Sequence, residues 1–298
     1  MSRWFERDEK IADDSGLPDG LSRSGGEARQ RTSNEYEFQK TFGENRREPV
    51  RVHDRVFHLR PSERASLDAL GRFRVIEAGD LGRGVYGKDG GLAQVDFRAL
   101  IRQRLITPVS IRTTEGETRR IFTLTRDGHA VARSHGGEGQ QLYWGFAKPA
   151  ECAHDSRLYR AYLHEERQII AKGDSVKRVV LDYALKRDYF SRLNTHRDGK
   201  DYRQRQWEVG RELHLSIIDG HVVFPDFRIE YEDERGELGR VDVEVATGNY
   251  RGQHVAVKAA AGFRVYADRD TAGRLSIDKG PLLGGRFFPT ERSAVLLL

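Results

Sequence analysis

The chain has 298 residues, 37% of them hydrophobic, with a formal net charge of +5 and one cysteine. This length predicts about two domains, and the single Cys152 excludes an internal disulfide and a cysteine-based zinc cluster. Because no run approaches the roughly 18 to 20 apolar residues of a membrane span, and no secretion signal is evident, we expect a cytoplasmic protein outside the membrane, and its basic surplus favours a polyanionic partner.

The first 50 residues are expected to form a mobile tail. They hold nine Lys and Arg against eleven Asp and Glu, few aliphatic side chains, and a middle rich in Gly, Ser and Asp. Such a segment buries too little apolar surface to order itself. In the alternative, its aromatic residues dock on the body of the protein or on a partner subunit; these are Trp4, Phe5, Tyr36, Phe38 and Phe42.

Residues 51 to 135 carry sixteen Lys and Arg against ten Asp and Glu, a surplus larger than that of the whole chain. Their pattern predicts a helix from Pro61 to about Gly71, a short helix over 78 to 81, and a longer helix from about Gln94. Two strands follow, at 108 to 113 and 119 to 125, joined by a polar turn. This order of elements is typical of a winged helix-turn-helix.

The winged helix predicts a contact surface for double-stranded DNA. Its third helix should turn Val95 inward and present Arg98, Arg102 and Gln103 to the major groove. The hairpin, or wing, should bring further guanidinium groups to phosphates; these are Arg112, Arg119 and Arg120. The alternative is a winged helix that binds proteins or dimerises, with charges that are simply solvated.

A G-x-G-x-x-G pattern occurs at Gly82, Gly84 and Gly87. A dinucleotide site would need a hydrophobic strand before this pattern and a helix directly after it. A Lys-Asp-Gly-Gly segment follows instead, so we interpret the glycines as a flexible loop between helices.

Residues 136 to 152 are expected to link the winged helix to a second domain over 153 to 298. The pattern predicts helices over 154 to 190, interrupted at 172 to 174. A hairpin turning at Asp219-Gly220 follows, then a turn at 234 to 237 and a third strand over 240 to 246. A helix from Gln253, with Phe263 and Tyr266 on its apolar stripe, completes a helix, three-stranded meander and helix.

Three acidic residues interrupt the apolar pattern of these strands. Asp226 follows Pro225, and Asp242 and Glu244 alternate with valines, so all three are expected on one sheet face. Carboxylates are the ligands that Mg²⁺ prefers, and the pattern therefore predicts a metal-dependent phosphodiester site. The alternative is a solvated sheet face with polar residues at alternate positions. Glu208 or Glu212 would be a further ligand or an ordinary surface charge.

The order α-β-β-β-α, with Pro-Asp on the second strand and Asp-x-Glu on the third, resembles the PD-(D/E)XK nuclease core over about residues 175 to 298. With the winged helix, the chain resembles the replication-relaxation family of plasmid and mobile-element proteins. The matching segments are LTRDGHAVA at 124 to 132, AHDSRLYRAYL at 153 to 163, Phe224-Pro225-Asp226, Val243-Glu244-Val245, and Lys258 with Tyr266. The resemblance implies DNA binding in plasmid or element replication and maintenance, with a second copy or replication and mobilisation proteins as partners.

The chain departs from the nuclease pattern at Ala246, where the E-x-K motif has its lysine. Lys258 on the next helix would replace that lysine, or would extend along the sheet with its ammonium in water. In the active form, Asp226, Glu244 and the Val245 carbonyl would hold Mg²⁺, and Lys258 would position water. Asp242 would be a second or alternate ligand. The alternatives are an inactive DNA-binding accessory factor or repressor, and a protein-interaction subunit.

Overall fold

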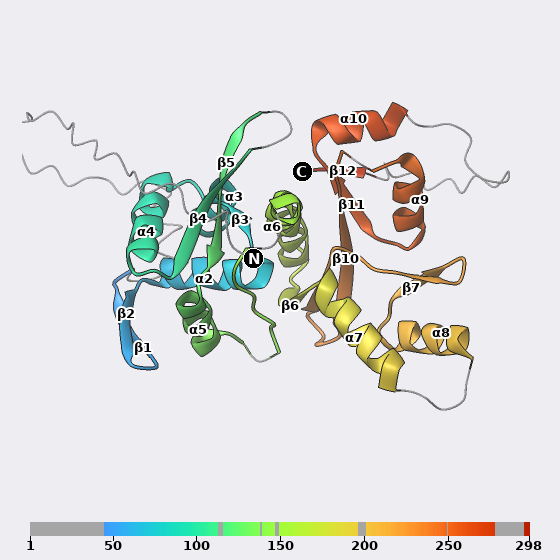
Figure 1. Ribbon diagram of the computed structural model, residues 1–298, viewed down its shortest axis with the longest axis horizontal. Coiled ribbons are helices and arrows are strands. Elements are labelled where there is room, and N and C mark those ends of the chain that lie inside the picture. Colours follow the sequence, from blue (N-terminus) through green and yellow to red (C-terminus); the bar gives the residue numbers. More distant parts are fainter. Residues whose placement is uncertain are drawn as a thin grey trace, which may run out of the picture.

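The computed structural model describes residues 45–112, 116–137, 139–146, 149–195, 201–248, 250–277 and 295–298. The chain has an α+β fold in which helices pack around two larger sheets (Figure 1). None of the helices in the described residues has both the length and the apolar character that a membrane crossing requires.

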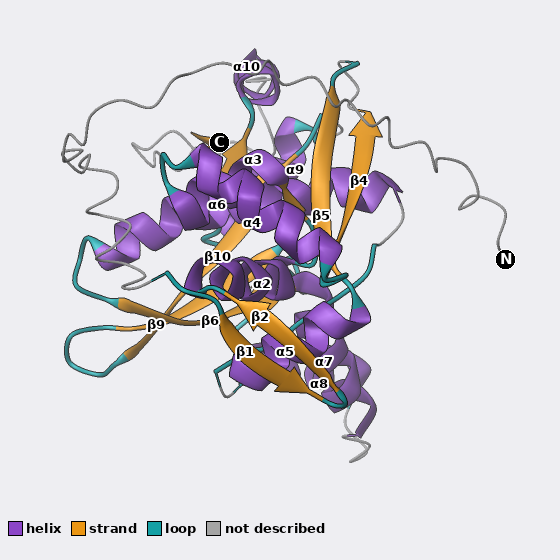
Figure 2. Ribbon diagram, turned by 90° about the vertical axis from the view of Figure 1, so that its left-hand side faces the viewer, coloured by secondary structure: helices purple, strands orange, loops and turns teal. Residues whose placement is uncertain are grey.

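Of the tail expected over residues 1 to 50, residues 1 to 44 lie outside the described part of the chain. Its last residues are not tail, because strand β1 (Glu48–Val52) pairs in antiparallel fashion with β2 (Arg55–Leu59). Val50 of β1 is buried in the main core. Figure 2 shows this hairpin beside a helix of the N-terminal half, α5 (Arg126–His135).

The N-terminal half contains the helices and strands that the pattern predicted. Its remaining elements are α2 (Pro61–Phe73), β3 (Ile76–Glu77), α3 (Ala78–Tyr86), α4 (Gly90–Arg102), β4 (Ile106–Arg112) and β5 (Thr118–Leu124). Strands β4 and β5 form the expected hairpin, and β3 pairs with the other edge of β5. Helix α4 begins at Gly90, earlier than predicted, because Asp89 caps it by accepting a hydrogen bond from Leu92 N–H at 2.9 Å.

The loop predicted at the G-x-G-x-x-G pattern is wrong for its first two glycines. Gly82 and Gly84 lie inside α3, and only Gly87 ends the helix, with φ of 60°. A Cβ atom at Gly84 would lie 2.2 Å from the hydroxyl of Tyr159. Glycine is therefore required there by the close approach of another helix, a contact that sequence reasoning alone does not reveal.

The C-terminal half centres on a five-stranded sheet. Its elements are α6 (Pro149–Ile170), β6 (Ser175–Leu181), α7 (Asp182–Thr195), α8 (Tyr202–Glu212), β7 (Ser216–Ile218), β8 (His221–Val223), β9 (Phe227–Glu232), β10 (Leu238–Ala246), α9 (Gly252–Ala260), β11 (Arg264–Ala267), α10 (Arg269–Ile277) and β12 (Val295–Leu297). The strand order is β12-β11-β10-β9-β6, with β9 antiparallel to β6 and β10 and with β10, β11 and β12 parallel.

Two segments predicted as helix are strands. Residues 175 to 181 form β6, and residues 264 to 267 form β11. Val265, Tyr266 and Ala267 are all buried, as in a strand covered on both faces. A short continuous apolar run of this kind has no alternation, so its spacing does not distinguish a strand from a helix.

Helix α6 lies between the N-terminal elements and the five-stranded sheet (Figure 1). Phe73 of α2 packs 5.3 Å from Tyr159 of α6 and 5.9 Å from Phe227 of β9, between ring centroids. The stretch predicted as a linker also packs, since Tyr143 is buried and its N–H donates to Gly71 O at 2.7 Å. One hydrophobic core therefore crosses the expected domain boundary.

Candidate functional site

Asp226 lies directly before β9, where the chain enters the central strands of the sheet. Its Oδ2 accepts a hydrogen bond from Val245 N–H at 2.7 Å and lies 3.2 Å from His154 Nε2. Because Val245 follows Glu244 on β10, this bond places Asp226 beside Glu244. Two of the three predicted acids are thus brought together by the pairing of β9 with β10.

Glu244 is the buried member of this pair, with 1% of its side chain exposed. It accepts hydrogen bonds from the Tyr250 hydroxyl and, at 2.9 Å, from Lys258 Nζ. Burial and the neighbouring charge of Asp226 raise the pKa of Glu244, in opposition to Lys258 and Tyr250. Two carboxylates that repel each other in this way favour the approach of a cation.

Lys258 reaches back into the site from α9. Its ammonium group donates to Phe224 O at 2.7 Å as well as to Glu244, and 21% of its side chain is exposed. The alternative arrangement, with the lysine extended into water along the sheet, is not the one observed. Lys258 therefore contacts Glu244 from the following helix, whereas position 246 is an alanine.

His154 and Tyr250 are site residues that the sequence reasoning did not identify. Burial alone would lower the pKa of His154, but Asp155 and Asp226 on either side raise it to about 10. His154 comes from α6, far from Asp226 in the sequence, and Tyr250 lies in the connection before α9. Neither residue is part of a periodic pattern in the sequence. The adjacent His154 and Asp155 are the one local feature that points to His154, and nothing comparable points to Tyr250.

Asp242 does not join the acidic pair. Its two carboxylate oxygens accept hydrogen bonds from Arg228 at 2.6 and 2.8 Å. Asp242 and Arg228 are direct cross-strand partners on β10 and β9, which explains this pairing. Glu208 and Glu212, the other candidate ligands, also have partners elsewhere. Gln204 donates to Glu208 at 3.2 Å, and Glu212 lies 3.7 Å from Arg192.

The acidic pair suits a hard divalent cation in number and in chemistry. Mg²⁺ in proteins commonly takes one or two carboxylates and completes its octahedron with water and phosphate. Within the described residues, no group of three or more His, Cys, Asp and Glu side chains is placed to hold a metal. Asp226 and Glu244 are a neighbouring pair of carboxylates, the ligand type that such an ion takes, and Asp242 is not a third because it pairs with Arg228.

The helix expected to contact DNA presents two of its three predicted residues. Arg98 and Arg102 are exposed on α4, whereas the Gln103 amide bonds to the backbone N–H and C=O of His58 at 3.0 and 3.1 Å. Gln103 thus fixes β2 to the end of α4. Val95 is 45% exposed rather than inward, because α4 buries the opposite face; that face carries Ala93, Asp96, Phe97, Ala99 and Leu100.

The β4–β5 hairpin also presents two of its three predicted arginines. Arg112 and Arg120 are exposed, whereas Arg119 is half-buried. Arg119 donates to Glu117 at 3.1 Å and to Glu77 at 3.5 Å. Its charge is therefore partly neutralised within the protein.

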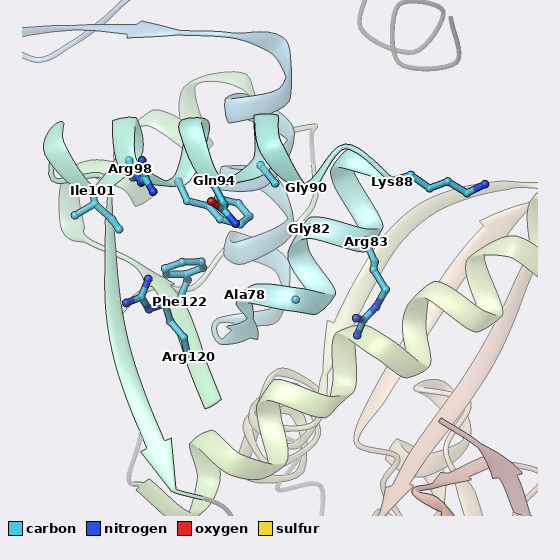
Figure 3. Close-up of a pocket in the computed structure, with 14 residues that line it drawn as sticks. Ala78, Gly82, Arg83, Lys88, Gly90, Gln94, Arg98, Ile101, Arg120 and Phe122 are labelled. Carbon is cyan, nitrogen blue, oxygen red and sulfur yellow. The ribbon is translucent and has the colours of Figure 1, made fainter. Parts of the chain in front are cut away.

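A groove of about 570 Å³ runs between α3, α4 and β5. Figure 3 shows Arg98 and Arg120 at one end of this groove and Arg83 and Lys88 at the other. Phe97 and Phe122 form part of its lining, with ring centroids 5.0 Å apart. The groove thus combines an apolar floor with four basic side chains.

The sequence matches no protein-family model and no curated protein.

Proposed function

We propose that this chain is a DNA-binding protein with an N-terminal winged helix and a PD-(D/E)XK nuclease-like site for Mg²⁺-dependent cleavage of DNA. The observation that carries the proposal is the meeting of Lys258 with Glu244, at 2.9 Å, beside Asp226. An acid at the start of one strand, an acid on the neighbouring strand and a lysine are components that metal-assisted phosphodiester hydrolysis can use. The resemblance to replication-relaxation proteins adds a cytoplasmic role in plasmid or mobile-element maintenance.

The order of elements supports the nuclease-like proposal. Helix α6, strands β6, β9 and β10, and helix α9 occur in the order α-β-β-β-α, with further elements between β6 and β9. Asp226 lies at the entry to the second of these strands, and Glu244 is on the third. The first strand is β6 rather than the segment after His214, and α7 through β8 form an insertion between the first and second strands.

Asp226, Glu244 and the Val245 carbonyl would hold Mg²⁺. The ion would activate a water molecule and stabilise the negative charge that develops on the phosphate. Lys258 would orient that water and neutralise charge in the transition state, since its ammonium group already lies at the buried glutamate. His154, at 3.2 Å from Asp226 Oδ2, would fix the orientation of that carboxylate.

The exposed arginines of the N-terminal half support the DNA partner. Arg98, Arg102, Arg112 and Arg120 lie on α4 and on the β4–β5 hairpin, which are the recognition helix and wing of the proposed winged helix. Each phosphate that they neutralise releases counterions, so affinity should fall steeply with salt, with a log-log slope near −0.9 per contact. Arg98→Gln should reduce this slope more than Arg119→Gln, because Arg119 is already paired with Glu77 and Glu117.

The deciding experiment is incubation of the full chain with supercoiled plasmid in Mg²⁺, in Mn²⁺ and in EDTA. Metal-dependent nicking should be present in the wild type and absent in Asp226→Ala and Glu244→Gln, while both variants still shift the plasmid in a gel. Glu232→Gln is the matched control, because Glu232 pairs with Lys177 on the sheet surface. Nicking that survives Asp226→Ala at the wild-type rate would refute the assignment.

The second candidate is an inactive accessory factor or repressor. It is favoured by the contacts of Glu244, which Lys258 and Tyr250 already engage. In that case the plasmid shifts but no metal produces nicking. The third candidate, a protein-interaction subunit, would give neither nicking nor a shift.

A further inference from the structure

Helix α8, in the insertion between β6 and β9, exposes aromatic side chains beside arginines. Trp207 is 49% exposed, and the guanidinium carbon of Arg211 lies over its ring at 4.6 Å from the centroid. Tyr202 is 52% exposed and has Arg205 at 5.9 Å from its ring centroid. Exposed aromatic rings next to arginines are the components of surfaces on which nucleic-acid bases stack.

Trp207 and Arg211 line a depression of about 630 Å³. Its other side is formed by Arg240 of β10 and by the segment from His214 to Ser216. Two acids, Glu208 and Glu212, also line it. Glu208 accepts a hydrogen bond from Gln204, and Glu212 pairs with Arg192. Arg211 and Arg240 are both exposed, and Arg211 lies over the Trp207 ring.

The depression adjoins the proposed cleavage site. Arg240 and Glu244 lie on the same face of β10, four residues apart, which corresponds to about 13 Å at roughly 3.3 Å per residue. Ser216 Oγ, in the wall of the depression, donates to Ala261 O at 2.7 Å, at the end of the helix that carries Lys258. A nucleic-acid strand that runs from the acidic pair to Trp207 would pass over the segment from Leu213 to Ser216, which covers the buried Arg228 and its partner Asp242 on this face.

We propose that Trp207 and Arg211 form a stacking site for an unpaired base of single-stranded DNA next to the cleavage position. The proposal rests on the proposed function and names the form of its substrate: duplex with an adjoining unpaired segment. A paired base buries both faces between its neighbours, so an aromatic ring at the surface stacks only on a base released from the duplex. Arg240, across the depression, would contact the phosphate of that nucleotide.

Tryptophan fluorescence tests the stacking site directly, because the chain has three tryptophans. The full chain is titrated with oligo(dT) of about 15 nucleotides and with a duplex of equal length. Oligo(dT) should quench the wild type and the control Trp144→Phe, and should leave Trp207→Phe nearly unquenched. Trp144 is 52% exposed and lies beside His129 in the other half of the protein, which makes it a matched control.

Affinity provides the second readout. Trp207→Ala should weaken oligo(dT) binding about tenfold, as expected for the loss of one stacked base, and should leave duplex binding within about twofold of the wild type. Trp207→Phe should recover most of the affinity, because a benzene ring also stacks. Unchanged quenching in Trp207→Phe, or equal oligo(dT) affinity in Trp207→Ala, would overturn the stacking site.

The two proposals fail separately. If plasmid nicking is absent but Trp207-dependent quenching persists, the cleavage function is wrong and the single-strand site stands. If nicking depends on Asp226 but Trp207→Ala binds oligo(dT) like the wild type, the stacking site is wrong and the cleavage function stands. Unfolding curves of Trp207→Ala and Trp207→Phe exclude loss of folding as the cause of weaker binding.

Discussion

Arg228 and Asp242 face each other across β9 and β10 in a buried, two-pronged ion pair. Arg228 donates from Nε and Nη2 to the two Asp242 oxygens at 2.6 and 2.8 Å, and its side chain is 4% exposed. The same guanidinium donates to the carbonyls of Leu213 and His214 at 2.7 and 2.9 Å. Asp242 therefore orients the Arg228 guanidinium, which holds the residues after α8 against the sheet.

Asp242→Ala should destabilise the protein by about 3 kcal/mol, because it leaves a buried guanidinium without its counterion. The double variant Arg228→Met with Asp242→Leu should recover much of that loss, since it removes both charges. Urea unfolding measures the free energy of each variant. If Asp242→Ala unfolds like the wild type but no longer nicks plasmid, Asp242 is a metal ligand and its assignment as a structural residue is wrong.

Two glycines of α3 form a matched pair for testing helix packing. Gly84→Ala should destabilise the protein by about 1 to 3 kcal/mol, because its Cβ would lie 2.2 Å from the Tyr159 hydroxyl. The Cβ atom of Gly82→Ala would lie 4.0 Å from Ala93 Cβ, at ordinary van der Waals distance. This variant should stabilise the protein by about 0.5 to 1 kcal/mol, as alanine does within helices. Equal effects of the two variants in urea unfolding would contradict the close packing of α3 on α6.

Restoring a lysine at position 246 should not restore an E-x-K site. Ala246 is fully buried in an apolar cluster with Val255 and Val265. Ala246→Met should cost about 1 to 3 kcal/mol through overpacking. Ala246→Lys should cost more, because it also buries an ammonium group.

In a Lys258→Met background, Ala246→Lys should therefore leave plasmid nicking absent. The comparison uses the nicking rate together with the urea unfolding of each single variant. Recovery of nicking in the double variant would show that the ammonium group can reach the acids from position 246.

His129 should make the stability of the protein depend on pH in the weakly acidic range. Burial lowers the pKa of His129 below its ordinary value of 6.5. As the pH falls through 6.5, the unfolded chain binds a proton that the folded protein resists, so stability falls. The neutral His129 ring therefore contributes to stability in full above the pKa that it has in the unfolded chain. This contribution is lost as the pH falls through the lower pKa that it has in the folded protein.

His129→Gln should remove this part of the pH dependence. The measurement is the urea midpoint of the wild type and of the variant at pH 7.5 and at pH 5.5. These two pH values lie on either side of the unfolded-state pKa of histidine, roughly 6.5. The wild type should lose stability relative to the variant at the lower pH. A difference between the two proteins that does not change with pH would show that His129 titrates alike in the folded and unfolded states.

Local signals were sufficient where the chain interacts with its near neighbours. The turn at Asp219-Gly220 was predicted from two residues, and both have positive φ, 50° and 76°, as a tight hairpin requires. The helix over 61 to 73 and the β4–β5 hairpin followed from apolar spacing and from turn residues in the same way. In each case the contacts that fix the conformation lie within a few residues along the chain.

The sequence by itself determined that Asp226 and Glu244 would come from neighbouring segments of the chain, because a turn at 234 to 237 joins the two apolar runs that hold them. It did not determine that Glu244 faces Lys258 and Tyr250 while Asp242, two residues away on the same face, faces Arg228. Nor did it place His154 beside Asp226. These partners come from other strands and helices, so their choice depends on strand register and helix packing, which only the tertiary structure decides.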